Sequence, residues 1–371
     1  MVTPMKLDTK KIDRIEVPTG VLDLDVTADS RWVYVAALDG VYRIDCESTS
    51  VQLLDKHPSY VSGVALADED QRLVSAGYDG CLQFRDLSNL QSDSLPLEPV
   101  RTENAHSFWS WKLAASPDRK RVASVSGQYL AGGERYEPLA ATEPTVKVYD
   151  SLTGEPLHAF EFLPSVQAVA FDPSGRFLAA GNLMGDIAVW DLTTGKLVTQ
   201  WRTPDFTSWG IIKSHCYIGG IHALMFSADG KSLYAAGMGE MRDPMAGNGR
   251  QLWQQFDWNL PEAKKIRETE RKQAGEGLME TLVLHPSGDW FVMAGRLRGG
   301  DWNVGFFSVA DGSRIGFLKT DVRVTSARFG ADGKTFYLGG LKNQGKPNDK
   351  GEWPKFGIVD RYQVSLGEMP S

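Results

Sequence analysis

Four residues of this chain could combine into a site that binds a metal ion. His215 and Cys216 are adjacent, and His222 and Glu280 add a second imidazole and a carboxylate. These are ligand types that zinc takes in proteins. Their spacing matches no metal-binding motif, and the sequence contains no nucleophile elbow, phosphate-binding loop or metal-binding helix motif. We therefore predict no catalytic residue, no metal ligand and no cofactor, and a metal site at these four residues stays an open alternative.

The elements that would have to position these residues are short strands. Residues 166–201 contain four short apolar runs separated by turn signals, the first of which is Asp172-Pro173-Ser174-Gly175. Strand-length runs rich in Val, Ile, Phe and Trp, with turns this close together, predict a sheet of four antiparallel strands. Such a sheet has two apolar faces that it cannot bury alone, so it needs copies of itself on either side.

The rest of the chain supplies those copies. Each unit has an alternating apolar strand, a polar turn and a second apolar strand that ends in small residues. The units begin near residues 21, 61, 110, 166, 221, 279 and 324. A period of roughly 40–58 residues is typical of a β-propeller. The sequence thus predicts one all-β domain over residues 1–371, a seven-bladed propeller of four-stranded antiparallel sheets.

Two segments decide how the blades are completed. The last unit lacks an obvious fourth strand, and residues 11–17 form a spare strand at the start of the chain. Because a closed ring should leave no sheet edge bare, we expect 11–17 to close the last blade. Fourth strands are expected at 95–99 and 265–270, among others. The charged stretch 264–272 is therefore interpreted as an exposed outer strand and not as a helix.

Composition limits the function classes. The net charge is −7, which argues against nucleic acid as a partner because phosphate binding requires a basic face. No apolar run approaches the roughly 20 residues of a membrane span, and residues 1–14 do not have the pattern of a secretory signal. The three cysteines, Cys46, Cys81 and Cys216, are widely spaced, which predicts reduced thiols and a cytoplasmic protein.

Several motifs resemble those of WD-repeat β-propellers. Val189-Trp190-Asp191 resembles the third-strand ending that names the family. Degenerate forms are Phe84-Arg85-Asp86 and Val148-Tyr149-Asp150. His57 and His106 each stand four residues before an inner strand, where the family places a structural histidine. The resemblance implies that this histidine holds an aspartate on the turn before the third strand. It also implies that partner-contacting residues favour the channel mouth.

The insertions are expected to gather on one face. Strand direction places the second-to-third-strand loops and the inter-blade loops on the same side of a propeller, together with the second residue of each inner strand. The long segments are 127–144, 239–249, 296–303 and 341–355, with inter-blade segments 104–109 and 202–220. The second residues are Leu22, Ser62, Trp111, Gln167, His222, Glu280 and Thr325. Long loops on a rigid scaffold often carry binding residues.

We predict that this face binds a protein or peptide as a non-catalytic scaffold. The expected partner-binding residues are Trp109, Trp111, Tyr129, Tyr136, Gln167, Trp209, Tyr217, His222, Glu280, Trp302 and Trp353. For Trp302 and Trp353, burial within their own loops is an equal alternative. Asp23, Lys112 and Arg328 are expected to face the channel as solvating groups.

Two other functions stay open. One is an enzyme, a hydrolase or lyase acting on a small molecule or sugar at the channel mouth. The other is assembly into a homo-oligomer through the long loops. An enzyme requires several polar groups with shifted pKa values that converge in a pocket, whereas a platform shows a broad aromatic patch without such convergence.

Overall fold

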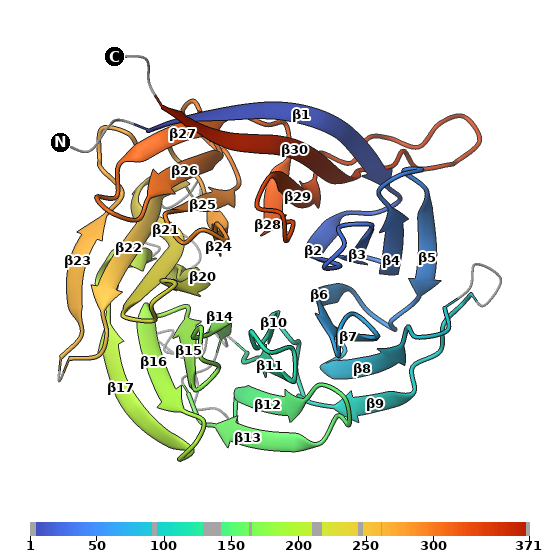
Figure 1. The fold of residues 1–371 in the computed structure, drawn as a ribbon, viewed down its shortest axis with the longest axis horizontal. Helices are drawn as coiled ribbons and strands as arrows, with labels where there is room; N and C mark the ends of the chain where they lie inside the picture. Colours follow the sequence, from blue (N-terminus) through green and yellow to red (C-terminus); the bar gives the residue numbers. More distant parts are fainter. Residues whose placement is uncertain are drawn as a thin grey trace.

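The computed structural model describes residues 5–90, 95–128, 142–162, 165–209, 217–243, 248–260 and 262–368. Within these ranges, seven four-stranded antiparallel sheets stand around a central axis, and one two-stranded sheet lies between blades (Figure 1). The predicted fold class, an all-β seven-bladed propeller, is confirmed.

Each blade runs outward from an inner strand to an outer strand. Blade 1 contains β2 (Val21–Val26), β3 (Trp32–Ala37), β4 (Gly40–Asp45) and β5 (Val51–Asp55); blade 2 contains β6 (Val61–Ala67), β7 (Arg72–Gly77), β8 (Cys81–Asp86) and β9 (Arg101–Asn104); blade 3 contains β10 (Lys112–Ala115), β11 (Arg121–Val125), β12 (Val146–Asp150) and β13 (Pro156–Phe160); blade 4 contains β14 (Val166–Phe171), β15 (Phe177–Asn182), β16 (Asp186–Asp191) and β17 (Lys196–Arg202).

The remaining elements complete the ring. The segment after blade 4 forms the 3-10 helix η1 (Pro204–Phe206) and the hairpin of β18 (Thr207–Trp209) and β19 (Tyr217–Gly219). Blade 5 contains β20 (Ile221–Phe226), β21 (Ser232–Asp243), β22 (Asn248–Asp257) and β23 (Lys264–Glu268); blade 6 contains β24 (Met279–Leu284), β25 (Trp290–Gly295), β26 (Val304–Ser308) and β27 (Arg314–Leu318); blade 7 contains β28 (Arg323–Phe329), β29 (Thr335–Leu341), β30 (Gly357–Glu368) and β1 (Met5–Val17).

Three local predictions are tested by these bounds. The charged stretch does form an outer strand, because β23 pairs with β22. The outer strand of blade 2 was wrongly expected at 95–99 and is instead β9. Pro96 and Pro99 have no N–H to donate to a ladder, and Leu95 and Leu97 instead pack against the cluster between blades 1 and 2. The expected loop 239–249 is also wrong, since β21 and β22 extend into it as a hairpin.

The hydrophobic core lies between blades and not within them. Each of the seven buried clusters among the described residues joins two neighbouring sheets. In one of them, Ile187 and Val189 of β16 pack with Leu224 and Phe226 of β20. Burying an apolar side chain of this size stabilises the fold by about 1.5–3 kcal/mol. Every blade therefore depends on both of its neighbours for the burial of its two faces.

The two ends of the chain close the ring. β1 pairs antiparallel with β30 over twelve residue pairs, from Met5 opposite Glu368 to Val17 opposite Gly357, and the two strands lie side by side along the outer edge of blade 7 (Figure 1). The pairing carries a charged cluster around the buried carboxylate of Asp360. Arg14 Nε and Nη2 donate to this carboxylate at 2.7 and 2.8 Å, and Lys11 Nζ lies 2.9 Å from it.

A polar network crosses the interior of blade 2. His57 Nε2 lies 2.8 Å from Ser75 Oγ, and His57 Nδ1 lies 3.2 Å from Asp79 Oδ2. Burial raises the pKa of Asp79, but the hydrogen bonds from His57 and from the backbone N–H of Cys81 together outweigh burial, and the pKa is lowered. On the other side, the fully buried Arg85 donates to Ser75 Oγ at 2.8 Å and to Asp55 Oδ2 at 2.5 Å. The histidine thus holds the aspartate that the family resemblance implies.

Blade 3 contains an incomplete version of this network. His106 Nε2 lies 3.0 Å from Ser124 Oγ, but its buried Nδ1 has no partner among the described residues. Burial, followed by the positive charge of Lys147, lowers the pKa of His106 to about 4. The imidazole is therefore neutral in the folded protein at neutral pH.

The closing cluster should stabilise the whole fold. Replacement Arg14→Ala leaves the buried Asp360 with Lys11 alone, and we expect the free energy of unfolding to fall by about 2 kcal/mol, below the full cost of breaking a buried pair because one partner remains. Urea denaturation measures this. The matched control is Arg176→Ala, which removes an exposed arginine that pairs with Asp191 inside blade 4 and should change stability little. Equal effects of the two replacements would contradict a special role for the closure.

His106 should make stability depend on pH. The unfolded chain binds a proton at this residue near pH 6.5, whereas the folded chain resists it until about pH 4. Since the unfolded state binds more protons in that window, stability is retained above pH 6.5 and falls by roughly 3 kcal/mol as the pH drops towards 4. His106→Gln should flatten this part of a denaturation series from pH 7.5 to 4.5. Parallel curves for the two proteins would show that His106 does not contribute.

Candidate functional site: the channel mouth on the long-loop face

The second residues of the inner strands meet at one end of the central channel. A cavity of ≈ 170 Å³ is lined there by ten residues. They are Leu22, Ser62, Tyr78, Trp111, Lys112, Gln167, His222, Glu280, Arg323 and Thr325. All seven positions expected at the mouth are among them. In each blade, the start of the inner strand pairs with the end of the second strand, so this mouth lies on the face of the second-to-third-strand loops.

A repeated backbone irregularity places these side chains. In six of the seven inner strands the register shifts across the residue that lines the mouth, as between Val61 and Gly63 or between Ile221 and Ala223. That residue is therefore left out of the ladder, in the manner of a β-bulge, which bends the strand and redirects a side chain. The same bulge in blade after blade gathers these residues at one rim.

An ion pair and a neutral histidine occupy one side of the mouth. Arg323 Nε and Nη2 donate to the two oxygens of Glu280 at 2.7 and 2.9 Å. This hydrogen bonding raises the pKa of Arg323. His222 Nε2 donates to the carbonyl of Gly219 at 3.1 Å, and burial lowers the pKa of His222. The charges of the pair are mutually satisfied, and the imidazole is neutral at neutral pH.

Two polar groups at the mouth are left without partners. Gln167 Nε2 donates to Ser165 Oγ at 3.2 Å, but its buried Oε1 has no hydrogen-bond partner among the described residues. Lys112 Nζ likewise makes no hydrogen bond or ion pair with the part of the chain that the structure describes. A buried acceptor without a partner costs about 1–3 kcal/mol. The mouth therefore offers one acceptor and one cationic donor to an incoming ligand.

An aromatic cluster stands beside the mouth. It consists of Tyr60, Tyr78, Phe108, Trp109 and Trp111. The ring of Trp109 stacks on Tyr78, with centroids 4.6 Å apart, and on Phe108, with centroids 5.1 Å apart. Tyr60 is 50% exposed and Trp109 is 41% exposed. Stacked rings of this kind are fixed in place and still present apolar area to solvent.

The histidine network of blade 2 coincides with a match to a known family. Residues 48–86 match the family model described as WD domain, G-beta repeat. This segment contains His57, Ser75 and Asp79, and its strands recur in the seven blades of the ring. Residues 48–86 of this seven-bladed propeller thus match a WD repeat. The degenerate repeats keep the blade architecture while most lack the Trp-Asp pair.

The chain is similar to U3 snoRNP-associated protein-like EMB2271 of Arabidopsis thaliana. The two chains are 28% identical over 149 residues, which is 39% of this chain and 30% of the relative. The alignment thus spans less than a third of the relative's length. In the described part of the propeller, no helix has the length and apolar character needed to cross a membrane.

The structure separates the other residues predicted to bind a partner. The prediction that Trp302 contacts a partner is wrong, and the alternative of burial holds. Trp302 is 2% exposed, and its Nε1 donates to the carbonyl of Gln273 at 2.8 Å. Trp353 is 59% exposed but does not line the mouth. Trp209 and Tyr217 lie opposite each other in the β18–β19 hairpin, and only their backbone is described. Tyr129 and Tyr136 fall outside the described residues.

The described residues do not form the candidate metal site. His222 and Glu280 both line the mouth, but His215 and Cys216 lie outside the described residues. Within the described ranges, no group of three or more His, Cys, Asp or Glu side chains is arranged to hold a metal ion. Cys46 and Cys81 are free thiols.

Sequence reasoning missed several residues of the site. Tyr60, Tyr78, Phe108 and Arg323 were not among the predicted partner-binding positions. Tyr60 directly precedes β6 and Tyr78 directly follows β7. Both positions are adjacent to the strand ends that meet at the mouth. An inspection of the residues just before each inner strand and just after each second strand would have identified Tyr60 and Tyr78.

Proposed function

We propose that this WD-repeat propeller is a non-catalytic scaffold whose protein or peptide partner docks on the face with the narrow channel mouth. The observation that carries the proposal is the aromatic cluster of Tyr60, Tyr78, Phe108, Trp109 and Trp111. Aromatic anchors dominate the energy of many protein interfaces because a large rigid area is buried at low entropic cost. Such a surface on a rigid ring suits a partner that must be held in one orientation.

The polar groups of the mouth complement an extended peptide. Gln167 Oε1 can accept a hydrogen bond from a backbone N–H, and Lys112 Nζ can donate to a carbonyl or carboxylate. Arg323 and Glu280 form a polar rim beside the rings. An apolar centre with a polar rim is the usual arrangement at protein interfaces.

The alternative of an enzyme at this mouth receives less support. Its acid, Glu280, is bound by Arg323 through two hydrogen bonds. Its base, His222, donates its Nε2 proton to a backbone carbonyl. Among the described residues, neither group is paired with a nucleophile in the manner of a catalytic triad. We therefore favour binding over chemistry.

The relative suggests the kind of assembly to test. Its printed name associates that protein with the U3 snoRNP, which is a ribonucleoprotein. The present chain has a net charge of −7, which favours contact with a protein over direct contact with RNA phosphates. We propose that a protein surface is recognised even if the whole assembly contains RNA.

Capture from a lysate of the source organism tests the proposed face. The double variant Tyr60→Ala/Trp109→Ala removes the two exposed rings of the cluster, and we expect it to lose at least 90% of the partner that the wild-type chain retains, since anchor residues carry most of the binding energy. Mass spectrometry with isotope labelling measures the ratio. Treatment with ribonuclease before capture should leave the wild-type signal in place.

The matched control is Phe317→Ala. Phe317 is 50% exposed on the outer strand β27, so its loss removes a similar ring without touching the mouth, and capture should persist. Retention of the partner by the double variant would refute the proposed face. Loss of the partner after ribonuclease treatment would refute recognition of a protein. Size-exclusion chromatography shows whether the captured partner is a second copy of the chain, an outcome that would replace the proposal by self-assembly.

A further inference from the structure

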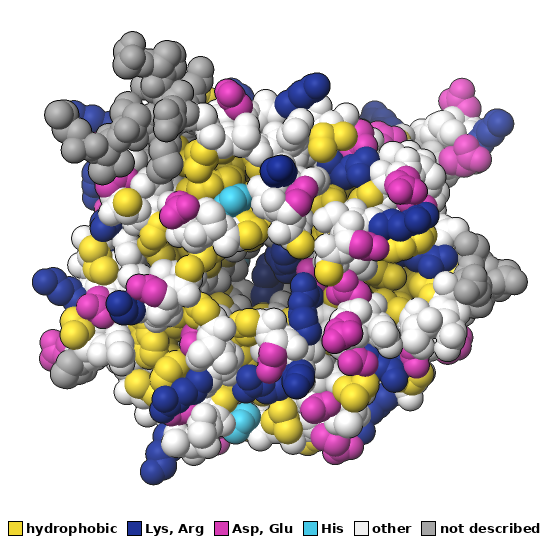
Figure 2. Space-filling view, viewed as in Figure 1, with side chains coloured by type: hydrophobic (Ala, Val, Ile, Leu, Met, Phe, Trp, Pro, Cys, Tyr) yellow, Lys and Arg dark blue, Asp and Glu magenta, His cyan; other side chains and the backbone are white. Residues whose placement is uncertain are grey.

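A second and larger cavity occupies the channel at the end opposite the aromatic cluster. Its volume is ≈ 690 Å³, and residues from the inner strands of all seven blades line it, together with first-to-second-strand turns that include Pro117, Pro173 and Pro286. Figure 2 shows the hollow at the centre of the ring, with Lys and Arg side chains gathered in and around it. Cavities that bind small molecules commonly measure about 300–1,000 Å³.

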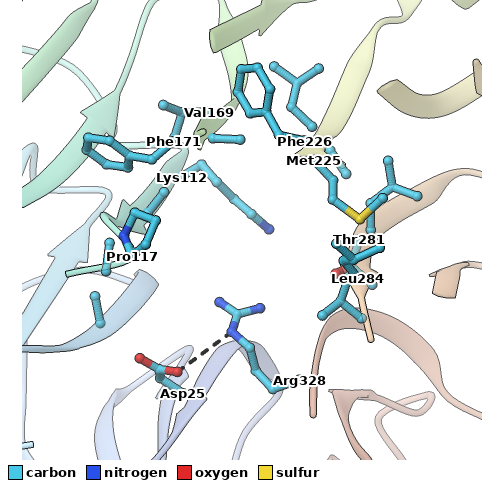
Figure 3. A pocket seen from close by; sticks show the side chains of 18 of the residues that line it. Asp25, Lys112, Pro117, Val169, Phe171, Met225, Phe226, Thr281, Leu284 and Arg328 are labelled. Atoms are coloured by element: carbon cyan, nitrogen blue, oxygen red, sulfur yellow. Dashed lines mark ion pairs between the residues drawn. The ribbon is translucent and has the colours of Figure 1, made fainter. Parts of the chain in front are cut away.

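The wall of this cavity is divided into an apolar part and a charged part. Apolar side chains from β14, β20 and β24 form one side, with Phe171, Phe226 and Leu284 among them (Figure 3). Asp25 of β2 and Arg328 of β28 lie on the other side, and the Lys112 side chain points from β10 into the open centre towards Arg328 (Figure 3). A molecule with one charged end and one apolar end matches this division.

The acidic groups near the cavity are already engaged. Asp25 forms a very short contact with Arg119 Nη1 and accepts the backbone N–H groups of Val26 at 3.0 Å and Leu66 at 2.9 Å. Asp23 accepts the hydroxyl of Ser326 at 2.6 Å. The hydrogen bonds of these two carboxylates are therefore made largely by groups other than Lys112 and Arg328, the cations in the centre of the channel.

The two cations at the centre are much less engaged. Lys112 Nζ has no hydrogen-bond or ion-pair partner among the described residues. Arg328 Nη1 donates to the carbonyl of Ala327 at 2.8 Å, but the guanidinium lies 3.5 Å from Asp23 and 3.7 Å from Asp25, too far for strong charged hydrogen bonds to a carboxylate. Both cations therefore remain available to an anion.

Basic side chains outnumber acidic ones along the channel, so its lining carries a net positive charge. The residues that line the two cavities include four with basic side chains, Lys112, Arg119, Arg323 and Arg328. They include two with acidic side chains, Asp25 and Glu280. Low-dielectric walls strengthen the attraction of this surplus for an anion and focus it along the channel.

We propose that this cavity binds a small amphipathic anion, a carboxylate or phosphate monoester with an apolar body. The anionic group lies between Lys112 Nζ and Arg328, and the apolar body packs against Phe171, Phe226 and Leu284. None of the five aromatic-cluster residues lines this cavity, whereas Tyr78 and Trp111 line the narrow mouth. The two proposals share Lys112, which lines both cavities. Their failures remain distinguishable, because the partner face is tested with Tyr60→Ala/Trp109→Ala and the anion site with Lys112→Met.

Isothermal titration calorimetry with octanoate and with octyl phosphate tests the proposal. We expect saturable binding of at least one of these anions to the wild-type chain. Lys112→Met, which keeps the length of the side chain but removes its charge, should weaken binding at least tenfold, and Lys112→Arg should restore most of it. Comparison of octanoate with octyl phosphate shows which head group the site prefers.

Two controls separate the site from general charge and general hydrophobicity. Lys231→Met removes an exposed lysine from the first-to-second-strand turn of blade 5 and should change affinity less than twofold. Octanol, which shares the apolar body, should bind at least tenfold more weakly than octanoate. Absence of binding by both anions, equal binding of octanol, or undiminished binding to a folded Lys112→Met variant would each overturn the proposal. Circular dichroism confirms that the variants are folded.

Discussion

The structure depends on one constraint, which is that no blade can bury its own two faces. The seven hydrophobic clusters lie between sheets, so the stability of each blade is shared with its neighbours. An open row of such sheets would leave two apolar faces in water. The ring removes both, and the pairing of β1 with β30 joins the two ends of the chain. In the cluster between blades 7 and 1, Ile15 and Val17 pack with Val35 and Ile44, so the closing strand contributes to the core as well as to the ladder.

This constraint also explains the position of the binding surfaces. Because the blades repeat in register, equivalent positions of the inner strands arrive at equal depths in the channel. Repeated bulges then turn the second residue of most inner strands towards one mouth. Positions further along the same strands, such as Phe171 and Phe226, line the opposite end. One scaffold thus presents two chemically different cavities, one beside aromatic rings and one with available cations.

The features that follow from the repeat could be predicted from the sequence. The features that depend on individual side-chain contacts could not. The period of the apolar runs was enough for the seven blades, the closing strand and the positions at the mouth. It was not enough for Trp302, whose burial depends on the carbonyl of Gln273, or for β9, which is displaced by two prolines. Arg85 takes the position of the tryptophan in the Trp-Asp pair and is buried between Ser75 and Asp55. Contacts of this kind join residues far apart in sequence, so periodicity does not encode them.

Hydrogen exchange in a chain that lacks residues 1–17 tests the central role of closure most directly. The account predicts that amides of β3 and β4 in blade 1 and of β29 in blade 7 exchange at least tenfold faster than in the intact chain, although none of these strands is hydrogen-bonded to β1. The reason is that the interface between blades 7 and 1 loses apolar contacts from β1. Faster exchange confined to β30, with unchanged protection in β3 and β4, would contradict the account.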